Sequence, residues 1–149
     1  MNFELEFTFG ATFKPPVDIG AGPFGNRNVY ELTGGTVEGK RLKGKVLTGG
    51  ADWLLIGADG FARLDVRGQF LTDDGASIYV QYAGLLEMNQ KVGEAVASGG
   101  STDYGDQYFR ITPRLETGDP RYAWLNQSVF VAEGRLGPGK VEYKVYRVV

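Results

Sequence analysis

The first thirteen residues alternate hydrophobic and polar side chains. Aromatic and aliphatic residues occupy the odd positions from Phe3 to Phe13, while Glu4, Glu6 and Thr8 occupy even ones. A period of two is typical of a β-strand with one buried face. The pattern therefore predicts a half-buried strand at the start of the chain.

Similar patterns predict further strands, separated by Gly-rich turns. After a Pro/Gly-rich loop at 14–28, strands are expected at 29–33, 41–48, 52–57, 61–72, 76–86, 106–112, 122–135 and 140–149. The only helix candidate is 89–98, which Gly99-Gly100 should end. About nine antiparallel strands and one short helix predict an all-β fold with a single domain over 1–149. We expect a β-barrel rather than a sandwich, because closure removes exposed strand edges.

Tight turns at Gly49-Gly50, Asp59-Gly60 and 73–75 sort the side chains of the predicted meander onto two faces. The more apolar face should line the interior and contains Leu42, Gly44, Val46, Trp53, Leu55, Leu64, Val66, Gly68, Phe70, Tyr79, Gln81 and Ala83. On the other face, Asp52 lies opposite Arg67 as a cross-strand ion pair.

A second register is also open for Asp52. A bulge near residues 49–51 would turn Asp52 inward beside Trp53. Burial against the indole would then raise the pKa of the carboxyl and suit it to acid–base chemistry.

Composition removes several kinds of chemistry. The chain has no Cys and no His, which excludes disulfides, Ser-His-Asp and Cys-His nucleophile systems, and zinc sites with thiolate or imidazole ligands. No metal site is predicted, because the densest carboxylate cluster, Asp73-Asp74, is explained by turn chemistry. Residues 20–25 match G-x-G-x-x-G, but a strand is expected after them instead of a helix, so we reject a dinucleotide site.

Several segments together resemble one family, and their order and spacing agree with it over nearly the whole chain. They are Leu32–Gly35, Gly39–Trp53, Leu64–Arg67, Thr72–Gly75, Ile78–Val80, Tyr108–Arg110 and Pro113–Asn126. The chain resembles the "domain of unknown function 3237" family, also called uncharacterised protein family 0311. The resemblance implies a small β-barrel similar in outline to lipocalins, as found in bacteria and fungi. It implies no particular reaction.

Three carboxylates are candidates for moving a proton: Asp52, Asp65 and Glu116. The candidates for ligand binding are Trp53, Tyr79, Tyr82, Arg110, Trp124 and Asn126. Several of them have a structural alternative: core packing for the tryptophans, a solvated tip for Arg110, surface ion pairs for Glu116 and a structural hydrogen-bond tie for Asn126.

Three functions remain open. The first is an enzyme without a cofactor, a lyase, isomerase or hydratase acting on a small aromatic or carboxylated metabolite. Arg110 would anchor an acid and Tyr79 or Tyr82 would donate a hydrogen bond. The second is a carrier or sensor of a small hydrophobic ligand, and the third is a structural barrel with a filled core. A cavity near ~300 Å³ would exclude the third, and a carboxylate of raised pKa facing the cavity would favour the enzyme.

The partners expected are a small-molecule ligand and further copies of the chain. Leu54, Ile56, Val80 and Tyr82 fall on the face assigned to the outside, so either the N-terminal strand or a second subunit should cover them, and we expect a homodimer or larger oligomer. A net charge of −2 disfavours nucleic acid. No stretch approaches the ~18 apolar residues of a membrane span, and the N-terminus lacks the pattern of a signal peptide. A cytoplasmic location is the resulting expectation.

Overall fold

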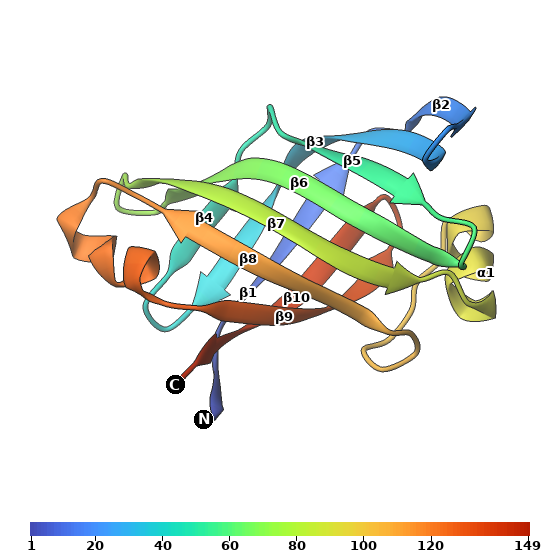
Figure 1. The fold of residues 1–149 in the computed structure, drawn as a ribbon. Coiled ribbons are helices and arrows are strands. Elements are labelled where there is room, and N and C mark those ends of the chain that lie inside the picture. Colours follow the sequence, from blue (N-terminus) through green and yellow to red (C-terminus); the bar gives the residue numbers. More distant parts are fainter.

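The chain forms one antiparallel sheet that closes on itself, as seen in a computed structural model of residues 1–149 (Figure 1). Strand β1 closes the barrel, because it pairs with β10 on one side and β3 on the other. The strands are β1 (Phe3–Phe13), β2 (Val17–Gly22), β3 (Gly25–Gly39), β4 (Lys43–Val46), β5 (Ala51–Ile56), β6 (Phe61–Thr72), β7 (Ser77–Glu87), β8 (Phe109–Glu116), β9 (Phe130–Gly137) and β10 (Lys140–Val148). The predicted barrel is confirmed.

The expected hairpin at Gly49-Gly50 does not form. Strands β4 and β5 both pair with β3 on one side and with β6 on the other. They therefore occupy one position in the barrel wall, and residues 47–50 interrupt it as a bulge. An irregularity is thus present where the bulge was expected, but it does not change the parity of the strand, because Val46 before it and Leu54 after it are both buried. Asp52 shares that even parity and faces inward because no hairpin reverses the chain here.

Two other turns are one residue longer than a two-residue hairpin loop. Gly57 N donates to Phe61 O at 2.9 Å around residues 58–60, and Thr72 N donates to Ala76 O at 2.9 Å around residues 73–75. Gly60 and Gly75 have φ of 82° and 94°, the left-handed geometry of a three-residue loop. As a result Asp52 pairs with Val66 rather than with Arg67, and the predicted ion pair is wrong.

This change of register corrects the predicted faces. Positions assigned to β4 and β6 were right, since Val46, Leu64 and Phe70 are buried. Those of β5 and β7 were reversed: Trp53 and Tyr79 are on the outside, each 40% exposed. Leu54, Val80 and Tyr82 instead face the interior and are buried, and Ile56 is partly buried against the core. The apolar outer face on which the expectation of a second subunit rested is therefore absent.

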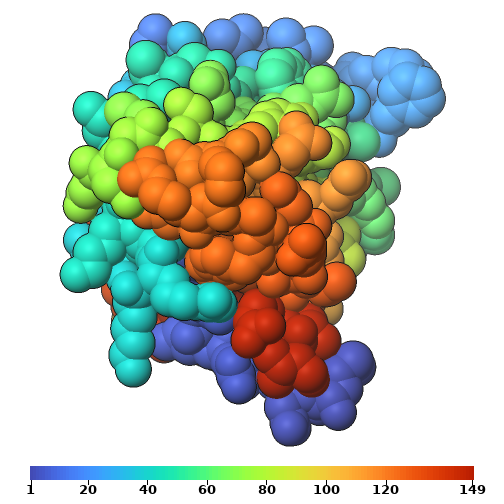
Figure 2. All heavy atoms as spheres, turned by 90° about the vertical axis from the view of Figure 1, so that its left-hand side faces the viewer, coloured from blue at the N-terminus to red at the C-terminus, as the bar shows by residue number.

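A 3₁₀-helix, η1 (Pro120–Gln127), replaces the first half of the strand expected at 122–135. Asp119 caps it by accepting a hydrogen bond from Arg121 N at 2.9 Å, and Pro120 starts it. Leu125 of this helix is 1% exposed because it is inserted into the end of the barrel. Figure 2 faces this end and shows η1, in orange, covering its centre.

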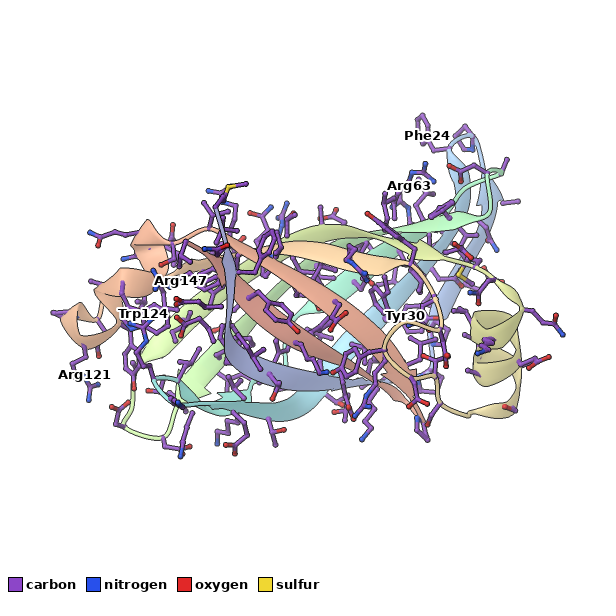
Figure 3. All side chains as sticks on the ribbon, turned by 90° about the horizontal axis from the view of Figure 1, so that it is seen from below. Phe24, Tyr30, Arg63, Arg121, Trp124 and Arg147 are labelled. Carbon is purple, nitrogen blue, oxygen red and sulfur yellow. The ribbon has the colours of Figure 1, made fainter.

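At the other end lies α1 (Gln90–Ser98), close to the helix predicted at 89–98. Asn89 caps its first turn, and Gly99 ends it in the left-handed conformation. The loop expected at 14–28 contains the hairpin of β2 and β3, which ends in the exposed Phe24 (Figure 3). The G-x-G-x-x-G residues lie in this hairpin, so a strand follows them, as expected. Neither helix of the protein is long and apolar enough to cross a membrane.

The half of the barrel nearest η1 is filled by aromatic rings. Phe7 contacts Phe70 and Phe130 with ring centroids 6.2 and 6.1 Å apart, and Phe130 contacts Trp124 of η1 at 6.4 Å. Phe9 forms the next layer towards α1 and contacts Tyr143, with ring centroids 4.9 Å apart. Beyond that layer the barrel is hollow.

Candidate functional site

A cavity of about 430 Å³ occupies the half of the barrel nearest α1. Most of its wall is apolar, with residues from strands β1, β3 and β5 to β10, from α1 and from the loops at this end of the barrel. Tyr82 and Tyr143, packed against Phe9, form its floor. The volume lies within the range of pockets for small metabolites.

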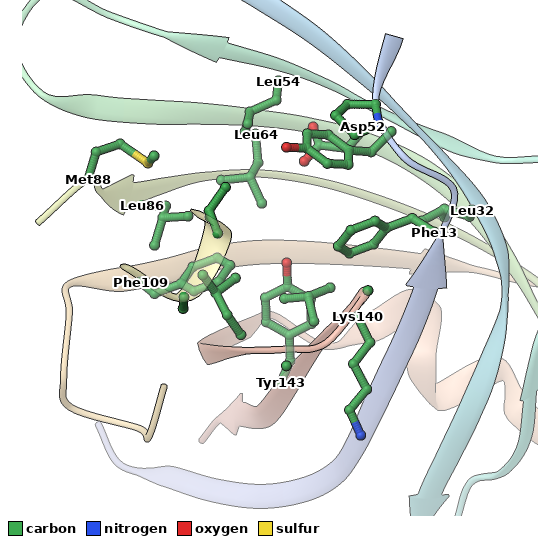
Figure 4. A pocket seen from close by; sticks show the side chains of 18 of the residues that line it. Phe13, Leu32, Asp52, Leu54, Leu64, Leu86, Met88, Phe109, Lys140 and Tyr143 are labelled. Carbon is green, nitrogen blue, oxygen red and sulfur yellow. The ribbon is translucent and has the colours of Figure 1, made fainter. Parts of the chain in front are cut away.

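Asp52 is the only carboxylate in this wall (Figure 4). It follows the bulge at 47–50, and its cross-strand neighbours are Tyr30 on β3 and Val66 on β6. Its side chain points inward with that of Leu54, two residues further along the same strand. Asp52 Oδ1 accepts a hydrogen bond from Asp65 N at 3.1 Å. The strands β5 and β6 have no paired residues between Asp52–Val66 and Leu55–Arg63, so this carboxylate satisfies a backbone donor that the ladder leaves free.

Burial raises the pKa of Asp52 to about 7. The hydrogen bond from Asp65 N opposes this shift, because it stabilises the ionised form, and the negative charge of Asp65 adds to it. A carboxyl with a pKa near neutrality exchanges protons in both directions at physiological pH, which is the property required of a general acid or base.

Three tyrosines surround Asp52. The negative charge of Asp52, together with the larger effect of burial, raises the pKa values of Tyr30, Tyr82 and Tyr143. Tyr30 is held by Phe13, whose ring meets it edge-on at 5.0 Å. Their raised pKa values keep all three hydroxyls protonated at neutral pH, so the cavity contains hydrogen-bond donors beside a single titrating acid.

No unpaired cation faces this acid. Lys140 is the only basic residue in the cavity wall, and its Nζ lies 2.9 Å from Glu142 Oε1. In Figure 4 the lysine side chain runs away from the cavity. The electrostatic character of the cavity is therefore neutral to negative, which disfavours an anionic ligand.

The structure brings together two of the nine predicted site residues, Asp52 and Tyr82. Five others lie on the outer wall of the barrel and are exposed: Trp53, Asp65, Tyr79, Arg110 and Glu116. Arg110 stacks above Tyr108 at 5.2 Å and donates to its neighbour's carbonyl, Phe109 O, at 3.0 Å. The predicted contact between Asp52 and the Trp53 indole is wrong, because adjacent residues of a strand point to opposite faces.

Trp124 and Asn126 lie on η1, at the end of the barrel opposite the cavity (Figure 3). Arg41 covers the Trp124 ring, with its guanidinium carbon 3.7 Å from the centroid. Asn126 Oδ1 accepts from Thr117 N at 2.8 Å, and Asn126 Nδ2 donates to Thr117 O at 2.9 Å. Asn126 is thus a structural tie, one of the two roles foreseen for it.

Sequence reasoning missed Tyr30 and Tyr143. A signal for Tyr143 was present, because it shares its strand parity with the apolar residues Val141 and Val145. A hydroxyl on an otherwise apolar strand face needs a partner inside the barrel and so indicates a polar site. Tyr30 carried no such signal, because its strand has no regular alternation.

Comparison with known proteins agrees with the closed barrel. The family model described as "Protein of unknown function (DUF3237)" matches residues 1–148. The UPF0311 protein of Clostridium acetobutylicum is 35% identical over 149 residues, covering 99% of this chain and 94% of the relative.

Two solved structures have the same fold. A conserved protein of unknown function from Rhodopseudomonas palustris superposes with a TM-score of 0.90 at 31% identity, covering 99% of this chain and 97% of that one. A protein described as an enzyme, from Penicillium herquei, superposes with a TM-score of 0.73 at 22% identity, covering 99% and 94%. Because the match extends along almost its entire length, the chain belongs to the DUF3237 family, the family that its sequence motifs resemble.

Proposed function

We propose that this protein is a cofactor-independent acid–base enzyme in which Asp52 transfers a proton to or from a small, largely apolar metabolite. The observation that carries the proposal is a carboxyl with a pKa of about 7 that faces an apolar cavity of about 430 Å³. The reaction class is that of a lyase, isomerase or hydratase, in which one positioned proton carrier is sufficient chemistry.

A non-catalytic carrier is the alternative, favoured by the apolar wall, of which 15 of 22 residues are hydrophobic. A carrier gains nothing from Asp52, however, because a carboxylate buried in an apolar cavity destabilises the fold once it ionises. Such a cost is typical of active sites. The description of the Penicillium protein as an enzyme is consistent with this choice, although its 22% identity extends only to the fold.

The metabolite class follows from the charges of the cavity. Arg110, the predicted anchor for a carboxylate, is exposed on the outer wall, and Lys140 is paired with Glu142. An anionic substrate would meet the Asp52 carboxylate with no compensating cation. Of the aromatic and carboxylated metabolites expected from the sequence, the aromatic class therefore fits better, and the charges of the cavity add that the molecule is uncharged.

Hydrogen–deuterium exchange of an enolisable ketone tests the proposal. Naphthylacetone is incubated with the protein in D₂O, and loss of the benzylic protons next to its carbonyl is followed by NMR. We expect catalysed exchange whose rate rises with pH through about 7, as Asp52 becomes the ionised base.

Asp52→Asn should abolish the catalysed exchange. Glu116→Gln is the matched control, because it makes the same chemical change at an exposed carboxylate of β8 and should leave the rate unaltered. Exchange that persists in Asp52→Asn would remove Asp52 from the mechanism. Binding of naphthylacetone without any catalysed exchange would establish the carrier instead.

A further inference from the structure

The Tyr143 hydroxyl is a buried polar group that the protein leaves unpaired. Tyr143 is 1% exposed, and its Oη has no hydrogen-bond partner. The Tyr82 ring lies edge-on to it at 5.5 Å, and the Tyr82 hydroxyl is the nearest polar group: beyond the larger effect of burial, its interaction with the Tyr143 hydroxyl raises the pKa of Tyr143 and lowers that of Tyr82. The two hydroxyls do not reach hydrogen-bond geometry, so Tyr143 Oη is left without a full partner. Buried polar atoms in folded proteins are almost always paired, so an orphaned hydroxyl requires an explanation.

The position of this hydroxyl points to a ligand. Figure 4 shows it directed into the cavity from the floor, on the side opposite Asp52. Its ring is fixed by Phe9 at 4.9 Å and by Phe109 at 5.4 Å, so the hydroxyl cannot leave the cavity to find another partner. Rigid packing around an unpaired donor is the arrangement of a preorganised binding group.

The chemistry of the missing partner can be stated. Tyr143 is protonated at neutral pH and donates, so the partner is a hydrogen-bond acceptor. The partner is uncharged when it binds, because the cavity holds the acid Asp52 and no free cation. The rest of the molecule is apolar, since it contacts side chains such as Phe13, Leu64 and Leu86.

We propose that Tyr143 binds the carbonyl oxygen of an uncharged aromatic ketone or a related carbonyl compound, with the carbon next to that carbonyl facing Asp52. This assignment rests on the proposed function and names its substrate class and its oxyanion-stabilising residue. In the step it implies, the Asp52 carboxylate takes a proton from that carbon. The electrons of the broken C–H bond form the C=C bond of an enolate, and the carbonyl oxygen takes up the negative charge beside the Tyr143 O–H.

Three ligands of nearly equal shape test whether binding depends on the carbonyl oxygen and on the absence of charge. Naphthylacetone carries the carbonyl, isobutylnaphthalene replaces the carbonyl oxygen with a methyl group, and naphthylacetate replaces the ketone with a carboxylate. Their affinities are measured for the whole protein by displacement of the neutral fluorophore phenylnaphthylamine. This readout avoids Trp53 and Trp124, neither of which faces the cavity.

We expect the ketone to bind more tightly than the hydrocarbon, and the carboxylate to bind least. Tyr143→Phe should weaken ketone binding by about tenfold, the worth of one buried hydrogen bond. Binding of the hydrocarbon by Tyr143→Phe should be unchanged or tighter, which also shows that the variant folds. Tyr82→Phe, a floor residue with the same chemical change, is the matched control and should affect the ketone less.

The assignment is overturned if Tyr143→Phe weakens ketone and hydrocarbon equally, if it weakens neither, or if naphthylacetate is the tightest ligand. These outcomes are distinct from failure of the proposed function. Ketone binding that depends on Tyr143, without proton exchange that depends on Asp52, would retain the ligand class and remove only the catalysis. Exchange that depends on Asp52 but not on Tyr143 would do the reverse.

Discussion

Replacing Asp52 by Asn removes the one carboxyl inside the barrel while preserving its shape. The Asn Oδ1 can still accept the hydrogen bond that Asp65 N donates to Asp52 at 3.1 Å. The variant therefore isolates the cost of a charge in the cavity. The tyrosines around that charge, Tyr30, Tyr82 and Tyr143, remain neutral near pH 7, and the negative charge of Asp65 on the outer face adds to the shift.

The pKa of Asp52 is about 7 in the folded protein, against 3.8 for the same group in water. The folded state holds the Asp52 proton more tightly than the unfolded state does. The contribution of this protonated carboxyl to the free energy of unfolding is therefore complete below about pH 4 and is lost as the pH rises through about 7. At about 1.4 kcal/mol for each tenfold change in proton affinity, the ionised carboxyl costs the folded state about 4 kcal/mol at pH 8. About 2.5 kcal/mol of this accumulates between pH 5 and pH 8. These values are upper limits, because the Asp52 side chain is not fully buried.

Urea unfolding at pH 5 and pH 8 measures this difference for the wild-type protein, Asp52→Asn and the surface control Glu116→Gln. The free energy of unfolding should fall by up to about 2.5 kcal/mol more in the wild type than in Asp52→Asn over this interval, with Glu116→Gln following the wild type. Equal pH dependence in all three proteins would refute the reasoning. It would mean that Asp52 ionises in the barrel as it does in water and that the cavity does not desolvate it.

Two further predictions concern the barrel itself. Gly35→Ala should destabilise the protein by more than about 2 kcal/mol in urea unfolding, because φ is 147° there and the new Cβ would collide with the Gly10 carbonyl oxygen. At Gly49, φ is 96° and the surrounding space is open, so Gly49→Ala should cost only about 1–2 kcal/mol, the penalty for placing a side chain on left-handed backbone. Equal losses of unfolding free energy in the two variants would show that no clash occurs at Gly35. Asn126→Ala should cost about 1–3 kcal/mol by removing both hydrogen bonds to Thr117 and leave ketone affinity unchanged, since η1 lies away from the cavity; a lost affinity would show that the two ends are coupled.

Helix boundaries depend on neighbouring residues in the sequence, whereas the buried face of a strand depends on its pairing with distant strands. Asn89 caps the start of α1 and Gly99 ends it, each through contacts within its own turn, so both ends of the helix can be predicted from the sequence. Asp119-Pro120 was a comparable local signal for η1, but the apolar residues that follow favoured a strand. The strand parity that linked Trp124 with Asn126 therefore does not apply, because both residues lie on a helix. Each has the structural role that was its alternative: Trp124 packs against Phe130, and Asn126 is tied to Thr117.

The site could be predicted only in part. Asp52 and Tyr82 were identified as residue types suited to the chemistry, whereas their location inside the barrel depended on the register. Residues 51–56 are apolar at both parities apart from Asp52, so no alternation reveals which side of β5 is buried. An Asp-Gly turn of two or of three residues has nearly the same sequence, and the difference of one residue exchanges the two faces of the strand.

The sequence by itself determined the fold class, the family and the absence of cysteine and histidine chemistry, because periodicity and composition are properties of short segments. Only the tertiary structure decided that the barrel is filled at one end and hollow at the other, and that Asp52 and Tyr143 face the same cavity. These residues lie on β5 and β10, which the closure of the ring sets across the interior from each other. Such a juxtaposition is a property of the closed sheet as a whole, and no segment of the chain carries it alone.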